Sequence, residues 1–352
     1  MTSHWWQQPV QAIDENARQA AQQRQSQLTK PPGSLGKLES LAIQLAGLQA
    51  NAMPVIEQCW VAVFAADHGI AHQGVSAFPQ IVTTEMVRNF ARGGAAISVL
   101  AAEQNARLEV VNVGTAHDPG ELPGVFDQRL GEGTADFSQQ PAMTPQQGQQ
   151  ALDAGRDSVQ RALDAGCDLY IGGEMGIANT TSAAALGCVL LQRPAAELVG
   201  PGTGLDDSGI RHKAAVIDAA IARHNIDPTD AQQVLDCFGG FEIAALTGAF
   251  MHAAQRGLPV LVDGFICSVA ALIAETLLPG SRQWFIYSHR SVEPGHRAIL
   301  DALHAEPLLD LGMRLGEGSG AAVALSLLRH ACALHNGMAT FEEAAVSGKE
   351  SD

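Results

Sequence analysis

The sequence predicts an α/β fold with a doubly wound, mostly parallel, Rossmann-like sheet and a small helical second domain. The 352-residue chain is rich in Ala, Gly, Leu and Val, is 46% hydrophobic, and has an aromatic content of only 5%. From Cys59 onward, short Val-, Ile- and Leu-rich runs are separated by helical segments. Because these runs are continuously apolar rather than alternating, they indicate strands that helices cover on both faces.

The ends of the chain lack such runs and are predicted to be helical. A polar, Gln- and Ala-rich helix over 9–27 is followed by a Pro- and Gly-rich turn at 30–36 and a second helix over 37–50. One face of that second helix carries Leu38, Leu41, Leu45 and Leu48. Residues 338–344 are predicted as a further helix capped by Thr340, with frayed residues after it. We expect residues 1–52 and about 336–352 to form the small helical domain, and about 53–335 the large α/β catalytic domain.

Within the large domain, strands are predicted at 60–65, 108–113, 168–172, 233–237, 259–263, 284–288 and 307–311. Helices are predicted at about 84–104, 147–165, 180–192, 209–224, 241–256, 267–278, 294–304 and 319–335. The Gly-, Pro-, Gln- and Thr-rich stretch 118–149 is predicted as a long connection. Because parallel doubly wound sheets bind ligands beyond the carboxyl ends of their strands, the functional residues are expected in the loops that follow the strands.

The charge balance and the cysteines limit the classes of function. Lys and Arg number 21 against 37 Asp and Glu, a formal net charge of −16, which argues against nucleic-acid or anionic-membrane binding. No run of about 18 uncharged apolar residues is present, and residues 1–9 have neither the basic start nor the apolar segment of a signal peptide. The six scattered cysteines form no C-x-x-C pair, so free thiols in a reducing cytoplasm are expected.

The most informative stretch is the glycine-rich loop at 311–320, between a predicted strand and a helix that begins near Ser319. Backbone N–H groups at such a helix start attract anions, and glycine lets a ligand approach the backbone closely. Glu317 breaks this pattern, since it places a carboxylate where an anion is expected. It is either a helix-capping acid or a base held beside a bound anionic substrate.

A second loop, at 172–182, repeats this arrangement around Glu174. Asn179 and Thr180 follow as caps of an Ala-rich helix. One of the two loops is suited to a phosphate and the other to supplying a base, while the alternative is that both glutamates only cap helices.

Three further loops carry polar residues. The loop 200–209 with Lys213 is suited to phosphate, and Asp206 and Asp207 are either acids of a helix N-terminus or magnesium ligands. Asp67 and His68 end the first predicted strand, in a position to orient an imidazole or bind a metal. The turn at 288–296 either contacts ligand or forms a subunit interface, whereas the strand-end turns at 239–242 and 263–265 are expected to serve helix packing. No P-loop, dinucleotide fingerprint or serine-hydrolase elbow is present.

Seven motifs together resemble the nicotinate-nucleotide:dimethylbenzimidazole phosphoribosyltransferase (CobT) family. They are KPPGSLG (30–36), ADHG (66–69), GVSAFP (74–79), GEMGIANTT (173–181), GTGL (202–205), SHRSVEPGH (288–296) and LGMRLGEGSGA (311–321). Their order along residues 30–345 is the order in the family.

The resemblance implies transfer of the 5-phosphoribosyl group from nicotinate mononucleotide to 5,6-dimethylbenzimidazole, giving α-ribazole 5′-phosphate and nicotinate in cobalamin assembly. It implies no metal and no other cofactor, because the departing nicotinate is already a pyridinium, and it implies a homodimer. By motif position, Glu317 is the general base and Glu174 a second catalytic residue. The ribose phosphate would be held by Glu174 with Gly176, Thr180, Gly202, Lys213 and Ser291. The benzimidazole slot would be lined by Phe78, Gln80, Met175, Met313 and Leu315.

Two alternative functions remain at this point. A metal-dependent hydrolase of small phosphorylated compounds would use Asp67, His68, Asp206 and Asp207. A non-catalytic nucleotide sensor would use the glycine loops only to hold its ligand. The acceptor also stays open, since residues after Pro79 and near Arg88 decide the preferred base.

Overall fold

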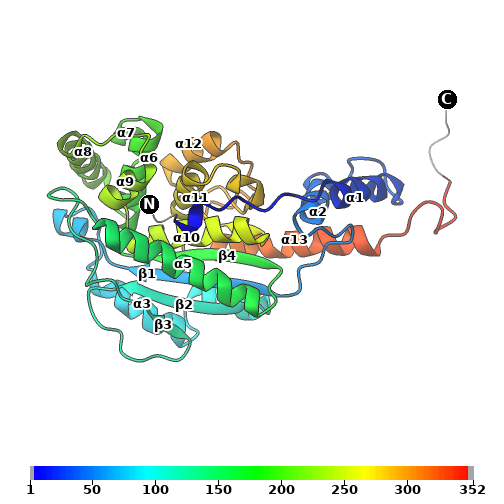
Figure 1. The fold of residues 1–352 in the computed structure, drawn as a ribbon, viewed down its shortest axis with the longest axis horizontal. Coiled ribbons are helices and arrows are strands. Elements are labelled where there is room, and N and C mark those ends of the chain that lie inside the picture. The colour runs from blue at the N-terminus through cyan, green and yellow to red at the C-terminus, as the bar shows by residue number, and fades with distance from the viewer. Residues whose placement is uncertain (1–3, 348–352) are drawn as a thin grey trace.

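The computed structural model describes residues 4–347 and contains a six-stranded, all-parallel sheet with the order β3-β2-β1-β4-β5-β6 (Figure 1). This is the strand order of a doubly wound fold, so the predicted class is confirmed. The strands are β1 (Cys59–Ala66), β2 (Arg107–Gly114), β3 (Val125–Asp127), β4 (Leu169–Met175), β5 (Val260–Val262) and β6 (Phe285–Tyr287). Every residue of β1, β5 and β6 is buried, as their apolar runs predict.

Helices cover both faces of the sheet. They are α1 (Glu15–Gln27), α2 (Lys37–Leu48), α3 (Ile81–Ala91), α4 (Ala96–Glu103), α5 (Pro145–Asp164), α6 (Asn179–Leu191), α7 (Ala195–Leu198), α8 (Asp207–His224), α9 (Ala231–Phe238), α10 (Phe241–Arg256), α11 (Phe265–Leu277), α12 (Pro294–Leu303) and α13 (Ser319–Gly337), with short 3-10 turns at Trp5–Gln7, Gly69–Gln73 and Ser281–Trp284.

Two adjacent glycines of β4 show how closely the two layers of helices approach the sheet. Successive residues of a strand point to opposite faces. A Cβ at Gly172 would lie 2.6 Å from a methyl carbon of Leu246 on α10, while a Cβ at Gly173 would overlap the carbonyl oxygen of Glu317 on the other face. The loop that carries Glu317 therefore lies directly on the sheet.

Two of the predicted strands are wrong. Residues 233–237 belong to helix α9, because Asp230 caps this segment by accepting from the Gln233 N–H and its apolar residues recur with helical spacing. Residues 307–311 form no strand. Pro307 has no N–H, and pairing with the chain after β6 is limited to one bridge between His289 and Leu309 before the left-handed Gly312.

Other boundaries also differ from the sequence prediction. Strand β3 was not predicted, since its three residues are too short to show a pattern. The helix predicted over 84–104 is two helices, α3 and α4, separated at Gly93 and Gly94. The first helix begins at Glu15, capped by Asp14, rather than at residue 9. Thr340 and Glu343 exchange the hydrogen bonds of a capping box, but only a turn follows them, and residues 348–352 of the predicted frayed end lie outside the described residues.

Helices α1 and α2 lie beside the distal end of α13, away from the sheet (Figure 1). Arg24 of α1 donates to the carbonyl groups of His335, Asn336 and Met338 at the end of α13, and Leu28 pairs with Thr340. Trp5, by contrast, contacts the large α/β unit, where its indole N–H donates to Asp153 of α5 over 2.7 Å. The division into 1–52 with 336–352 and 53–335 stays a prediction, and α13 runs continuously across its second boundary.

Within residues 4–347, no helix combines the length and the apolar character needed to cross a membrane.

Candidate active site

The loops at the carboxyl ends of β4, β5 and β6 enclose a cavity of about 340 Å³ together with the 311–320 loop and the chain around Phe78. Nine of the residues selected from the sequence line it: Phe78, Glu174, Met175, Gly176, Thr180, Gly202, Ser291, Leu315 and Glu317. These residues come from five separate segments of the chain. The fold therefore brings most of the predicted site together at the expected edge of the sheet.

Glu317 is held in an unusual backbone conformation. Its φ is 64°, and the flanking Gly316 and Gly318 have φ of 89° and 85°, so three consecutive residues are left-handed. A left-handed residue with a side chain costs about 1–2 kcal/mol, which the surrounding contacts must offset. One side-chain oxygen accepts from the Ile97 N–H at the start of α4, over 3.3 Å.

The environment of Glu317 favours its protonated form more than water does. Burial raises the pKa of Glu317 above its usual value; the Ile97 hydrogen bond opposes this shift, and the nearby Asp263 carboxylate adds to it. A carboxylate with a raised pKa is a stronger base once it has lost its proton. Glu317 is therefore suited to accept a proton from a ligand in the cavity.

Glu174 faces the same cavity from the end of β4. Asn179, at the start of α6, donates its side-chain N–H to Glu174, and the Glu174 carboxylate lies against Gly316 with no room there for a Cβ. Burial raises the pKa of Glu174 well above its usual value, and the carboxylates of Asp263, Glu242 and Glu317 raise it further. The two glutamates that sequence patterns singled out thus line one cavity, with Glu174 packed against the loop that carries Glu317.

A buried lysine lies behind the cavity wall at Thr180 and Gly202. The Lys213 ammonium, on α8, is 1% exposed and donates to the Thr180 hydroxyl over 2.7 Å, directly behind Gly202. Burial lowers the pKa of Lys213 to about 8, an effect that the nearby Glu293 carboxylate partly opposes. Glu293 accepts from the Gly202 N–H over 3.1 Å, and Arg314 donates to the Gly202 carbonyl over 2.9 Å. These contacts fix the glycine loop that the sequence predicts as an anion site.

Ser291 is positioned by a buried histidine. Its backbone N–H donates to Nδ1 of His296 over 2.8 Å, so the His296 proton is on Nε2, which lies 3.0 Å from the Ser268 hydroxyl. Burial lowers the pKa of His296 to about 3 and keeps the ring neutral. The Ser291 side chain stays at the cavity wall as a result.

Apolar side chains make up the rest of the wall and its rim. Val82, Met86, Met175, Phe265 and Ile266 line the cavity. Phe78 and Leu315 line it while remaining 52% and 59% exposed. Such a wall is suited to a flat apolar ring.

Three of the residues predicted to contact ligand lie outside the lining. Lys213 lies behind Thr180, as described above. Gln80 donates its side-chain N–H to the His68 carbonyl over 2.9 Å, and the Met313 carbonyl accepts from the Val292 N–H. Ser319, the predicted cap of the last helix, is its first residue, and the cap position belongs to Gly318.

The residues of the hydrolase alternative serve other purposes. His68 is fully buried between Glu242, at 2.7 Å, and the Ser182 hydroxyl. Asp67 accepts from the Thr83 hydroxyl and the Ala116 N–H. Asp206 caps α8 by accepting from the Gly209 N–H. Among residues 4–347, no three or more His, Cys, Asp or Glu side chains are grouped in a way that could hold a metal ion.

Six polar residues of the lining were not assigned to ligand one by one: Asn179, Thr203, Asp263, His289, Glu293 and Arg314. Asn179 was expected only as a helix cap, and Thr203, His289 and Glu293 lie in loops for which ligand contact was considered. The turn at 263–265 was assigned to helix packing alone. Asp263 directly follows an apolar strand, which is a usable signal, whereas its partners in α13 are more than 50 residues away along the chain. The packing interpretation does hold at Gly240, where a Cβ would overlap the His68 ring.

Comparisons with known proteins show the family of the chain. A family model described as Phosphoribosyltransferase matches residues 10–346. Proteins named nicotinate-nucleotide–dimethylbenzimidazole phosphoribosyltransferase from Pseudomonas syringae pv. syringae (strain B728a) and Pseudomonas putida (strain KT2440) are each 59% identical to the chain over 349 residues, with 99% of both chains covered.

Solved structures give the same result. The crystal structure of the enzyme of that name from Thermus thermophilus has a TM-score of 0.91 and 42% identity, and the match covers 96% of this chain and 100% of the other. A structure described as CobT from the same organism has a TM-score of 0.91 and 44% identity, with 94% and 99% covered. Neither a hydrolase nor a sensor is supported by these relatives. The chain belongs to the nicotinate-nucleotide–dimethylbenzimidazole phosphoribosyltransferase family and is a phosphoribosyltransferase.

Proposed function

We propose that this enzyme transfers the 5-phosphoribosyl group of nicotinate mononucleotide to 5,6-dimethylbenzimidazole, forming α-ribazole 5′-phosphate and nicotinate for cobalamin assembly. The observation that carries the proposal is a single cavity whose lining combines two kinds of group. It contains a buried carboxylate, Glu317, with apolar side chains, and also Thr180 and Gly202, behind which the Lys213 ammonium bonds to Thr180. The first set suits a flat nitrogen heterocycle and the second suits a phosphate.

In the proposed reaction, one ring nitrogen of the benzimidazole attacks C1′ of the ribose. The bond from C1′ to the pyridinium nitrogen breaks, its electron pair stays with the nitrogen, and neutral pyridine is released as nicotinate. Glu317 removes the proton from the other ring nitrogen, which increases the electron density on the attacking one. Because attack and departure take place on opposite faces of C1′, the β-nucleotide gives an α-product.

Donor binding is assigned to Glu174, Gly176, Thr180, Gly202, Lys213 and Ser291. The hydrogen bond from Lys213 to Thr180 and the fixed Gly202 loop support this assignment, because they arrange hydrogen-bond donors at the cavity wall before the nucleotide binds. The acceptor slot is assigned to Phe78, Met175 and Leu315, with Gln80 and Met313 acting from behind the lining.

Replacing Lys213 with arginine is expected to flatten the alkaline side of the pH profile. Because the pKa of Lys213 is about 8, kcat/KM for the nucleotide should fall above about pH 8 in the wild type, as the ammonium loses its proton. Arginine stays protonated throughout this range. Initial rates from pH 6 to about 10 measure the effect, with Lys37→Arg at a half-exposed position as the control. An identical alkaline fall in wild type and Lys213→Arg would contradict the assignment.

The direct test of the proposed function is to incubate the protein with nicotinate mononucleotide and to measure nicotinate release with and without dimethylbenzimidazole. Release that depends on the acceptor, together with formation of α-ribazole 5′-phosphate, supports the proposal. Release without acceptor would identify a nucleosidase instead. Repeating the assay with adenine and with a phenol determines how selective the acceptor slot is.

The exposed rim supports a homodimer. Val292, Leu311 and Leu315 are each more than half exposed near the mouth of the cavity, and apolar surface of this kind commonly marks a subunit contact. Sedimentation at micromolar protein concentration tests this, and a monomer would contradict it. The six free cysteines, five of them buried, are consistent with the cytoplasm as the place of action.

A further inference from the structure

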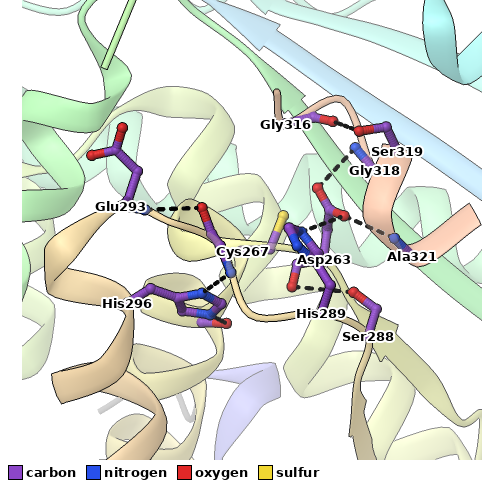
Figure 2. A network of polar contacts seen from close by, with 12 residues as sticks. Asp263, Cys267, Ser288, His289, Glu293, His296, Gly316, Gly318, Ser319 and Ala321 are labelled. Atoms are coloured by element: carbon purple, nitrogen blue, oxygen red, sulfur yellow. Dashed lines mark hydrogen bonds and ion pairs between the residues drawn. The ribbon is translucent and has the colours of Figure 1, made fainter. Parts of the chain in front are cut away.

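Asp263 is far in sequence from the 311–320 loop that carries Glu317, yet its side chain hydrogen-bonds the end of this loop to the edge of the sheet. It follows β5 directly and is 1% exposed. One oxygen of its carboxylate accepts from the Gly318 N–H over 3.2 Å, and the other accepts from the Ala321 N–H over 2.9 Å (Figure 2). Both donors lie within four residues of Glu317.

These two hydrogen bonds act as a helix cap. The cap position of α13 is Gly318, which has no side chain, and the Ser319 hydroxyl is used to donate to the Gly316 carbonyl. Without Asp263, the Ala321 N–H at the third position of the helix would have no acceptor in a buried environment. A carboxylate also interacts favourably with the positive end of the helix. Asp263, which directly follows strand β5, therefore caps helix α13 although it is far from it in the sequence.

The capped turn is the one that contains the left-handed Glu317. Gly173 of β4 fills the space against the Glu317 carbonyl on one side, and the Asp263 bonds hold the adjacent Gly318 on the other. We propose that Asp263 is a positioning residue, whose carboxylate fixes the 316–318 turn and so keeps the Glu317 side chain directed into the cavity. This inference rests on the proposed role of Glu317 as the base.

The charge of Asp263 gives the proposal a second readout. The titratable or charged groups around Glu317 are Glu174 at the end of β4, Asp263 after β5, His289 after β6 and Arg314 in its own loop; α4 contributes only its N-terminal N–H groups. His289 lies 3.6 Å from Asp263. Because the Asp263 carboxylate helps to raise the pKa of Glu317 and of Glu174, removing this charge should lower the pKa of both groups.

The test is Asp263→Asn. Asparagine has nearly the same shape, but an NH2 group replaces one of the two acceptor oxygens, so one backbone N–H faces a donor instead of an acceptor. We expect kcat to fall by about 10²-fold, the loss typical of a misplaced catalytic group, while KM for the nucleotide changes less than about threefold. The acidic limb of kcat/KM should move to lower pH, which a merely structural role would not cause. Hydrogen exchange of the segment 312–322 should become faster at Gly318 and Ala321.

Asp230→Asn is the matched control, since the Asp230 carboxylate also accepts from an N–H in the first turn of a helix, α9, but lies outside the cavity lining. The exchange measurement requires no turnover. Unchanged hydrogen exchange at Gly318 and Ala321 in Asp263→Asn overturns the positioning role, even if the wild-type enzyme proves to transfer the phosphoribosyl group to a base other than dimethylbenzimidazole. Faster exchange with wild-type kcat and an unmoved acidic limb overturns it as well.

If Asp263→Asn does not fold, Asp263→Glu tests the positioning role by the same measurements. Glutamate keeps the negative charge but moves the carboxylate by one methylene group. Faster exchange at Gly318 and Ala321 with a reduced kcat and an unmoved acidic limb supports the proposal. Wild-type kcat despite faster exchange contradicts it.

Discussion

Replacing Glu317 with glutamine is expected to slow phosphoribosyl transfer by at least about 10²-fold, within the range that general bases contribute. Glutamine has the same shape, and its amide oxygen can still accept from the Ile97 N–H. What it lacks is the ability to take up a proton at neutral pH. Single-turnover measurements with saturating nucleotide and dimethylbenzimidazole isolate this step from product release.

The affinity for nicotinate mononucleotide provides the internal control for this substitution. Titration with nicotinate mononucleotide should give the same dissociation constant for wild type and Glu317→Gln, because Lys213 and the Gly202 loop are untouched. Glu103→Gln makes the same chemical change at the exposed end of α4, and it should leave turnover unchanged. Turnover of Glu317→Gln near the wild-type level would end the assignment of Glu317 as the base.

Gly155→Ala is expected to lower the free energy of unfolding by at least about 3 kcal/mol, the upper part of the range for overpacked sites. Gly155 of α5 lies at the crossing with α10, where a Cβ would overlap the Ala245 carbonyl oxygen and come within 2.6 Å of the Ala249 nitrogen. Gly248 on α10 approaches the Leu152 backbone of α5 in the same manner. Because the obstacle is backbone, no side-chain rotation relieves the contact, and the two helices must separate.

Urea denaturation followed by circular dichroism measures this loss. Gly337→Ala is the control, because Gly337 is also helical but has no atom within 4 Å of the position of a Cβ. That substitution should leave stability unchanged or raise it by up to about 1 kcal/mol. Equal stabilities for the two variants would show that α5 and α10 tolerate a wider separation than their packing indicates.

The sequence predicts the sheet well where the strands are long and buried. β1 is a continuous apolar run and β4 begins as one at Leu169–Ile171, because helices cover both faces of the sheet, and such a run is recognised without knowledge of distant residues. The segment 233–237 was misassigned for a related reason. The segment has only three apolar residues among five, which is too few to separate a buried strand from a short buried helix, and the Asp230 cap and the helical spacing show only when the residues before and after it are included.

The candidate site was predictable in its glycine loops and not in its tertiary contacts. Glu174 and Glu317 stand out because each is a single acid among glycines before a helix. Asp263 does not, since its function depends on the Gly318 and Ala321 N–H groups, which only the folded chain brings to it. In the same way, Gln80 lies outside the cavity lining because its amide turns back to the His68 carbonyl.

Helix α13 has one further consequence. It spans 19 residues without interruption, so it is a rod about 28 Å long. Glu317 immediately precedes one tip of this rod, and Arg24 binds the carbonyl groups at the other tip. One uninterrupted helix therefore joins the unit formed by α1 and α2 to the turn that carries the carboxylate.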